Sequence, residues 1–399
     1  MADTPWLTII GIGEDGTAGL SASAKATLAD ADLVTGATRH LALLPDLKSA
    51  VEPWPVPFND GIPRLLAHRG KHVVMLVSGD PFWFGAGTSV TRHLAPDEWI
   101  AHPAPSTFGI AASRLGWPLE DTACLGLHAA PFARLRQHIA PGRRAIALVR
   151  DGATVGTLAH YLCDLGFGRS RLHILEALGG PRERIREIAA ADLHFDDIVH
   201  PVAVGIVFAG EGAVLPRTSG LPDAWFEHDG QLTKRPIRAL TLSALAPKPG
   251  ETLWDIGAGS GSIGIEWLLA HPSMQATAFE ADPIRAARAN SNAAALGVDR
   301  LRVVQGRAPD ALEDHATPDA VFIGGGLSEA LLDTLLIKLP TGTRLVANAV
   351  TLESEALLAR WHGLKGGNLL RIELFDAAPL GTRRGWRASY PVVQWSVTL

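Results

Sequence analysis

The chain has 399 residues, of which 47% are hydrophobic, and its formal net charge is −5. This length predicts two domains of about 100–200 residues each, and the acidic balance without a long basic stripe argues against a nucleic-acid partner. Two cysteines are too few for a disulfide framework, and no apolar run approaches the roughly 20 residues of a membrane span. We therefore expect a cytoplasmic protein without a membrane partner.

The first half of the chain alternates apolar runs with helical patterns, which is typical of an α/β fold. We expect strands at 6–13, 31–36, 72–80, 145–149, 171–178 and 199–208, and helices at 21–30, 61–69, 86–95, 106–116 and 155–166. The polar stretch 179–197 is interpreted as a turn. Residues 211–230 are rich in glycine and proline and have no period, so they predict a linker after a first domain of residues 1–210.

The alternation restarts in residues 231–399, the expected second domain. We expect strands at 251–257, 275–281, 301–306, 319–325, 343–350, 369–377 and 392–399, and helices at 262–271, 283–297, 328–339 and 351–364. No helical pattern separates the last two strands, and so short a connection favours an antiparallel end pair. The second domain is therefore predicted to be a Rossmann-like α/β sheet of seven strands.

A glycine-rich loop follows the first strand of the second domain. Gly257, Gly259 and Gly261 allow positive φ angles and let a ligand approach the main chain without a Cβ clash. The helix that follows offers unpaired N–H groups to an anion. Glu280 ends the next strand, where a carboxylate can accept hydrogen bonds from ribose hydroxyls. The loop therefore predicts a site for an adenosine-type ligand.

The sequence of this loop is consistent with two ligands, NAD and S-adenosylmethionine. Residues 259–264 match G-x-G-x-x-G with an acid about 20 residues on, so an NAD-dependent dehydrogenase is an alternative. Asp255 favours S-adenosylmethionine, because an acid there would repel a pyrophosphate but could receive the methionine ammonium group. The closing strand pair and the small-residue turn at 323–326 also favour a methyltransferase. Asp255 could instead support the loop through backbone N–H bonds.

The first half contains further turns of unusual composition at 9–16, 78–87 and 103–116. Asp80 ends a predicted strand, and Pro81 fixes φ and removes a backbone donor, so the chain turns sharply there. Ser106 precedes a predicted helix, where a hydroxyl can bind a ligand or, more commonly, cap the helix. Trp83 is as well suited to core packing as to a binding site.

Together, GIGEDG, SGDPFWFG and PAPSTFGIAASRLG resemble the tetrapyrrole methylases, which methylate corrin and sirohaem precursors, over roughly residues 5–210. The resemblance implies two α/β subdomains that bind S-adenosylmethionine. The positions that carry over to its binding site are Ser78, Gly79, Asp80, Trp83, Ser106 and Thr107. Many relatives have G-x-G-P-G in the first turn, whereas this chain has Glu14 and Asp15.

Residues 231–399 resemble the methyltransferase and decarboxylase subunit of cobalamin biosynthesis through LTKRPIRALTLSAL, DIGAGSGSIGIE, GRAPDAL and VANAVTLES. The cofactor positions that match are Thr233, Gly257, Ala258, Gly259, Ser260, Gly261, Glu280 and Ala308. The pair of modules implies two S-adenosylmethionine sites per chain. It also implies methylation of a corrin precursor at carbon 5 by the first module, and carbon 15 methylation with decarboxylation of the ring C acetate by the second. Another small-molecule or RNA methyltransferase with a regulatory N-terminal domain is the alternative.

A macrocycle with many carboxylates calls for arginines, which pair bidentately with carboxylate. Candidates are Arg383, Arg384 and Arg387 beside Trp386, and Arg39 with His40 in the first half, although each could belong to a solvated loop. Asp80, Arg383 and Arg384 are the candidates for a catalytic role. His68 and His72 straddle a glycine turn, so no metal site is expected. Related modules associate, so a homo-oligomer is expected.

Overall fold

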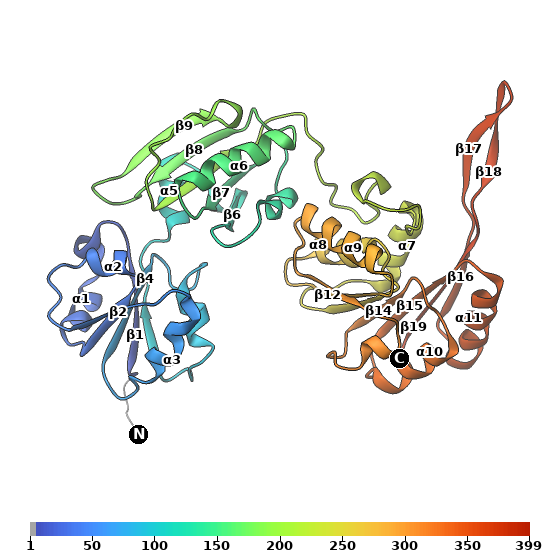
Figure 1. Cartoon of the computed structure of the whole chain (residues 1–399), viewed down its shortest axis with the longest axis horizontal. Coiled ribbons are helices and arrows are strands. Elements are labelled where there is room, and N and C mark those ends of the chain that lie inside the picture. The colour runs from blue at the N-terminus through green and yellow to red at the C-terminus, as the bar shows by residue number, and fades with distance from the viewer. Residues whose placement is uncertain (1–4) are drawn as a thin grey trace. The chain divides into compact units, whose positions relative to one another are not determined.

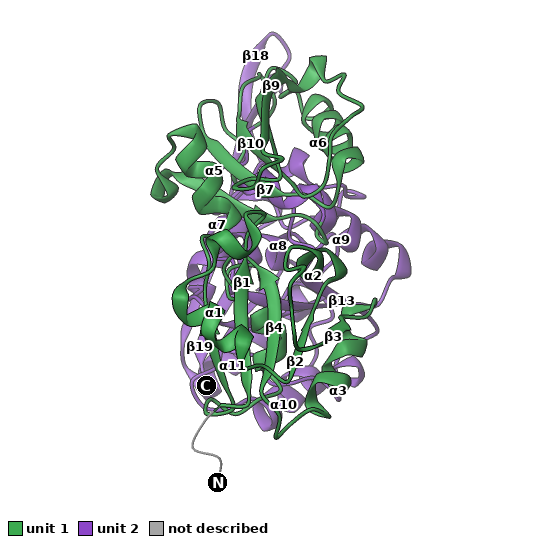
Figure 2. Cartoon of the chain, turned by 90° about the vertical axis from the view of Figure 1, so that its left-hand side faces the viewer, with its two compact units in different colours: residues 1–130, 138–213 green, residues 131–137, 214–399 purple. Residues whose placement is uncertain are grey.

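The computed structural model describes residues 5–399, which form two compact units (Figure 2). Unit 1 comprises residues 1–130 and 138–213, and unit 2 comprises 131–137 and 214–399. Residues 214–230, in the stretch expected as a linker, therefore belong to unit 2, and Leu215, Leu221 and Phe226 lie in its core. The independence of the two expected domains stays a prediction.

Unit 1 begins with a five-stranded parallel sheet in the order β3-β2-β4-β1-β5 (Figure 1). Its strands are β1 (Leu7–Ile12), β2 (Leu33–Gly36), β3 (Ala50–Pro53), β4 (Val73–Ser78) and β5 (Trp99–His102). Its helices are α1 (Ala22–Ala29), α2 (Thr38–Ala42), α3 (Gly61–Leu66) and α4 (Ala86–Thr91). Because parallel strands are buried on both faces, β1 and β4 are almost continuously apolar. All five carboxyl ends meet one edge of the sheet.

The second sheet of unit 1 also has five strands, in the order β6-β7-β10-β8-β9. The strands are β6 (Thr122–Gly126), β7 (Arg144–Leu148), β8 (Arg171–Glu176), β9 (Arg184–Ala189) and β10 (Val202–Val207), and the helices are α5 (Thr107–Leu115) and α6 (Gly152–Asp164). The prediction of a turn over 179–197 was wrong, because β9 lies within it. This edge strand carries arginines that pair with the buried Glu176, so its sequence lacks the apolar alternation of a strand.

Unit 2 contains a seven-stranded sheet in the order β13-β12-β11-β14-β15-β19-β16. Its strands are β11 (Thr252–Ile256), β12 (Gln275–Glu280), β13 (Leu301–Gln305), β14 (Ala320–Ile323), β15 (Arg344–Ala349), β16 (Asn368–Ile372) and β19 (Val392–Thr398). Its helices are α7 (Arg235–Leu245), α8 (Ser262–Ala270), α9 (Pro283–Ala295), α10 (Glu329–Lys338) and α11 (Leu352–Lys365). The first five strands are parallel, and β19 pairs antiparallel with β15 and β16. This confirms the Rossmann-like sheet and its antiparallel end pair.

Two apolar clusters cover the two faces of this sheet. One cluster joins the sheet to α7, α8 and α9, and the other joins it to α10 and α11. Figure 1 shows these helices beside the sheet. A hairpin of β17 (Phe375–Leu380) and β18 (Arg383–Ala388) projects from the end of the sheet. The strand predicted over 369–377 was therefore too long, since β16 ends at Ile372. The hairpin was missed because its charged and glycine-rich sequence has no buried face.

A buried arginine ties the start of unit 2 to its helices. Arg238 of α7 is 0% exposed, and its Nε donates to Glu266 Oε1 of α8 at 2.6 Å. The other oxygen of that carboxylate accepts the N–H of Gly220 at 2.6 Å, and Oε1 also accepts the N–H of Leu221 at 3.0 Å. Arg238 Nη1 pairs with Asp223 at 3.0 Å. These bonds attach the segment after residue 213 to the core.

Replacing Arg238 with alanine is expected to lower the free energy of unfolding by about 3–5 kcal/mol, because it leaves the Glu266 charge buried without its cation. Urea denaturation of the full chain measures this loss. Arg371→Ala is the control, since Arg371 pairs with Glu355 and Glu373 on the surface and should cost about 1 kcal/mol or less. Equal losses in the two variants would contradict a structural role for the buried pair.

Candidate functional site

The predicted glycine loop connects the end of β11 to α8 and leaves its main chain bare. Gly257, Gly259 and Gly261 have φ angles of 69°, 58° and 75°, in the left-handed region that favours glycine. A Cβ atom on Gly257 would lie 2.6 Å from Gly325, so the turn after β14 packs directly on the loop. A Cβ atom on Gly259 would meet only the carbonyl oxygen of Gln231, at 3.7 Å. The backbone at Gly259 is therefore open to a ligand.

Glu280, at the end of β12, holds this loop in place. Its Oε2 atom accepts the backbone N–H of Gly259 at 2.8 Å, and its Oε1 atom accepts that of Asp282 at 2.9 Å. The side chain is buried. A carboxylate oxygen has lone pairs for more than one donor, so the same group can also accept from a ligand hydroxyl.

Asp255 lies on β11 beneath the loop. Its Oδ2 atom accepts the N–H of Gly264 at 2.9 Å, which is the backbone support that the sequence left open. Among the described residues, its Oδ1 atom and the Oγ atom of Ser260 are buried without a hydrogen-bond partner. Burial raises the pKa of Asp255 to about 7, and the nearby Glu280 charge adds to the shift. Unpaired buried polar atoms are costly, so the site fits a polar ligand such as S-adenosylmethionine.

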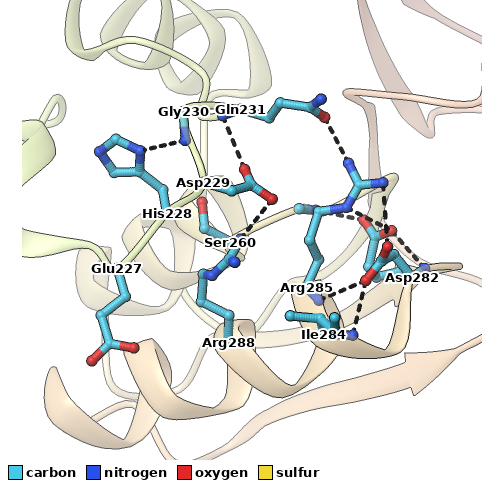
Figure 3. Close-up of polar contacts among 12 residues, drawn as sticks. Glu227, His228, Asp229, Gly230, Gln231, Ser260, Asp282, Ile284, Arg285 and Arg288 are labelled. Carbon is cyan, nitrogen blue, oxygen red and sulfur yellow. Dashed lines mark hydrogen bonds and ion pairs between the residues drawn. The ribbon is translucent and has the colours of Figure 1, made fainter.

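A short segment, 227–233, runs beside the loop and is attached to α9 (Figure 3). Arg285 Nη1 donates to Gln231 Oε1 at 2.7 Å, and Arg288 pairs with Asp229 at 2.9 Å. The predicted Thr233 lies at the end of this segment, half-buried, and its carbonyl accepts from Arg238. The segment therefore forms one side of the site.

Asn292 was missed by the sequence analysis. Its side chain is buried on α9, where Nδ2 donates to the carbonyl of Ser260 at 2.9 Å and of Glu227 at 3.0 Å. Its Oδ1 atom accepts the N–H of Glu227 at 2.8 Å. Asn292 thus joins the segment 227–233 to the glycine loop. A lone polar residue within a helix gives no signal in the sequence that separates this role from an exposed one.

The remaining predicted positions of unit 2 divide into two groups. Ala258 and Ala308 are half-buried and pack against the two core clusters of the unit. Arg383 and Arg384 are exposed on β18, and the hairpin projects away from the glycine loop (Figure 1). The structure therefore does not bring these two arginines to the loop, because the chain leaves the sheet after β16 and returns to it only with β19, after the hairpin.

The predicted residues of unit 1 lie in the turn after β4 and at the start of α5, and most have partners within the protein. Asp80 Oδ1 accepts the N–H of Phe82 at 2.8 Å, which holds the turn. Ser106 Oγ accepts the N–H of Gly109 at 3.0 Å, so it caps α5, the more common of the two predicted roles. Thr107 is the first residue of α5. These contacts are structural, and cofactor binding by these residues stays a prediction.

Gly79 and Trp83 flank the same turn. Gly79 has a φ of 54°, and a Cβ atom on it would lie 3.1 Å from the Pro105 carbonyl oxygen. The ring of Trp83 lies 5.1 Å from that of the buried Phe108, centroid to centroid, while 40% of its surface stays exposed. Trp83 therefore packs on the core with one part of its surface only.

Ser78 ends β4 beside the arginine and histidine of α2. Its Oγ atom is 2.9 Å from His40 Nε2 and is also hydrogen-bonded to Arg39. Burial, followed by the charge of Arg39, lowers the pKa of His40 to about 3.

No group of three or more His, Cys, Asp or Glu in residues 5–399 is placed to hold a metal ion. No helix in that range has the length and apolar character needed to span a membrane.

Two family models match the two units of the chain. A model described as tetrapyrrole (corrin/porphyrin) methylases matches residues 6–194, and one described as a precorrin methyltransferase domain matches residues 224–399. The chain is therefore a methyltransferase that combines a tetrapyrrole methylase domain with a precorrin methyltransferase domain.

Relatives match along the whole chain. A precorrin-6Y C(5,15)-methyltransferase (decarboxylating) of a Sinorhizobium species is 50% identical over 99% of this chain and 97% of its own. One from Mycobacterium tuberculosis H37Rv is 42% identical over 98% of this chain and 99% of its own. A cobalt-precorrin-6B C(15)-methyltransferase (decarboxylating) of Salmonella typhimurium is 34% identical over 40% of this chain and 85% of its own. The chain belongs to the family of decarboxylating precorrin-6Y C(5,15)-methyltransferases.

Replacing Gly259 with valine should abolish binding of S-adenosylhomocysteine at the glycine loop, because the side chain would fill the open space above the backbone. Isothermal titration calorimetry of the full chain measures this binding. Gly342→Val is the matched control, since Gly342 also has a positive φ, of 94°, and an added Cβ meets nothing within 4 Å. Unchanged affinity at the loop in Gly259→Val would rule out this site.

Asp255 should make stability depend on pH. Its raised pKa means that the folded chain keeps a proton between pH of about 4 and 7 that the unfolded chain releases, so the free energy of unfolding falls as pH rises through that window. Asp255→Asn removes this contribution and keeps an oxygen for the Gly264 N–H. We expect the variant to gain stability relative to the wild type from pH 4.5 to pH 8 in urea denaturation. Parallel pH profiles would contradict the shift.

Proposed function

We propose that this protein methylates carbons 5 and 15 of precorrin-6B and removes the carboxyl group of its ring C acetate to give precorrin-8X, a step of cobalamin biosynthesis. The observation that carries the proposal is the 50% identity to a decarboxylating precorrin-6Y C(5,15)-methyltransferase across 99% of the chain. A match of that length includes both units, so it supports both methylations rather than one. We expect the reaction to take place in the cytoplasm.

The two methylations divide between the units in this proposal. Unit 1 would methylate carbon 5, and unit 2 would methylate carbon 15 and promote decarboxylation. The Salmonella relative, whose name gives only carbon 15 methylation and decarboxylation, matches 40% of this chain, about the length of a single unit. The precorrin methyltransferase model matches residues 224–399, which lie within unit 2. These matches favour the assignment of the second chemistry to unit 2.

Each unit would hold its own S-adenosylmethionine, which supplies an electrophilic methyl group on sulfur. In unit 2, Glu280 would accept the ribose hydroxyls, Asp255 the ammonium group, and the loop from Gly257 to Gly261 would contact the adenosine. Charge on the ligand ammonium would stabilise the ionised form of Asp255. In unit 1, the residues from Ser78 to Trp83, with Ser106 and Thr107, would form the cofactor site.

The chemistry asks the protein mainly for alignment. A meso carbon of the macrocycle forms a bond to the methyl carbon while the sulfur–methyl bond breaks and its electrons stay on sulfur, and the meso proton then leaves. Holding the two reactants in line lowers the barrier by several kcal/mol. In the decarboxylation, the electrons of the broken carbon–carbon bond pass into the conjugated ring. Asp80, Arg383 and Arg384 stay predictions as catalytic residues.

A homo-oligomer is also part of the proposal. Strands β17 and β18 form a sheet of two strands. An isolated two-stranded ribbon is marginally stable in water. It carries Phe375, Leu380 and Trp386 at 54%, 69% and 77% exposure. Covering these side chains with a second copy of the chain would stabilise the hairpin, which supports self-association.

Mass spectrometry of the product tests the proposed function. The full chain is incubated with a precorrin-6B preparation and S-adenosylmethionine labelled in its methyl group. We expect a product that has gained two labelled methyl groups and lost one carboxyl group. Gly259→Val should stop at one methyl group with the carboxyl retained. A product with two methyl groups from that variant would contradict the division between the units.

A further inference from the structure

A second cluster of charged side chains lies in unit 1, at the edge where the parallel strands of the first sheet end. Glu14 follows β1, Arg39 lies in α2 directly after β2, and Ser78 ends β4. The turn between β8 and β9 adds Arg182 from the second sheet. Four segments that are far apart in the sequence thus bring one carboxylate and two guanidinium groups together.

The carboxylate of Glu14 bridges the two arginines. Its Oε1 atom lies 2.9 Å from Arg39 Nη1, and its Oε2 atom lies 3.0 Å from Arg182 Nη2. Only 10% of the Glu14 side chain is exposed, whereas 36% of Arg39 and 60% of Arg182 are exposed. The acid is therefore largely enclosed by the protein, while the Arg182 side chain is mostly exposed and the Arg39 side chain is partly exposed, with enough burial to lower the pKa of Arg39.

The turn that carries the second arginine is built to stay close to the first sheet. A Cβ atom on Gly180 would lie 2.6 Å from the Cβ and the carbonyl oxygen of Glu14, so only glycine permits this approach. Glu183 closes the turn, because it accepts the N–H of Gly179 at 2.6 Å and pairs with Arg114 at 2.6 Å and 3.1 Å. The turn is therefore positioned without any help from a ligand.

The charge of the cluster comes from the guanidinium groups. Burial lowers the pKa of His40 to about 3, with a further contribution from Arg39. Burial and the charge of Arg39 also lower the pKa of His200. Both imidazoles are thus neutral near pH 7, and Glu14, Arg39 and Arg182 together carry one positive charge in excess.

We propose that Arg39 and Arg182 bind one peripheral carboxylate of the tetrapyrrole in unit 1, with Glu14 as a residue that positions them. The proposal rests on the proposed function, which supplies a substrate with many carboxylates. In hydrogen bonds with described residues, Arg39 uses two and Arg182 one of the five N–H donors that each guanidinium has. The donors that remain can form the paired bonds that guanidinium makes with carboxylate.

Glu14 makes this arrangement possible. Two guanidinium groups held near one another repel, and the Glu14 carboxylate offsets that repulsion because it pairs with both of them. The same acid occupies the turn where many tetrapyrrole methylases have proline and glycine. The departure in the first turn thus has a physical role in this chain, which is to hold two arginines for one ligand group.

Binding of a porphyrin with eight carboxylate side chains tests the subsite. The matched probe is the same porphyrin with those groups converted to neutral amides, and fluorescence titration of the full chain measures both affinities. Arg182→Gln should weaken binding of the carboxylate probe about tenfold, because a charge-assisted hydrogen bond is lost, and leave the amide probe unchanged. Arg39→Gln should act in the same way. The double variant should lose less than the sum of the two, since both arginines bind one group.

Arg169→Gln is the control, since Arg169 is 72% exposed in the same unit and pairs with Glu211 at 3.0 Å. It should keep the wild-type affinity within about twofold, as surface pairs contribute little. Equal losses in Arg182→Gln and Arg169→Gln, or equal losses for both probes, would overturn the subsite. If the full chain forms the expected product but Arg182→Gln binds the carboxylate probe normally, the proposed function stands and the subsite is ruled out. If the full chain forms no product, both the proposed function and the subsite are ruled out.

Discussion

The site in unit 2 depends on two buried carboxylates that hold the backbone of the glycine loop. Glu280 accepts the N–H of Gly259, and Asp255 accepts that of Gly264 at the start of α8. The loop has only two side chains, those of Ala258 and Ser260, so its course depends on these hydrogen bonds and on the bonds from the N–H groups of Gly257 and Ala258 to the Phe279 carbonyl. Because the same glycines leave the main chain uncovered, the features that make the loop difficult to order also make it able to contact a ligand.

The position of these carboxylates follows from the parallel sheet. β11 and β12 are neighbours, so their carboxyl ends, and with them Asp255 and Glu280, lie side by side at one edge. Burial disfavours the charge on Asp255 and raises its pKa, and the nearby charge of Glu280 adds to this effect. In the proposed function, the ammonium group of the ligand would offset this cost.

Unit 1 uses the same edge of a parallel sheet for a different arrangement. The ends of β1, β2 and β4 there carry charged and polar side chains in place of a bare loop, and a turn from the second sheet closes over them. The Glu14 carboxylate accepts hydrogen bonds from Arg39 and Arg182 and so holds two side chains. The Glu280 carboxylate holds the backbone of the glycine loop in the same way. In both units a largely enclosed acid orders the groups around it at the carboxyl edge of a parallel sheet.

The buried polar network of unit 2 shows why its boundary was difficult to read. Residues 214–230 have the glycine and proline content of a linker, yet the backbone N–H groups of Gly220 and Leu221 bind Glu266 inside the unit. A pattern of apolar residues does not reveal this attachment, because backbone atoms and a single buried carboxylate make it. Asn292 escaped detection for the same reason.

The sequence by itself determined the α/β class, the order of the main strands and the glycine loop, because these depend on local periodicity and on residues whose backbone freedom is intrinsic. It also placed Glu280 correctly at the end of its strand. Only the tertiary structure decided which polar groups meet. Glu14 is 25 residues from Arg39 and 168 residues from Arg182 in the sequence. Side chains so distant are brought together by sheet topology rather than by any local pattern.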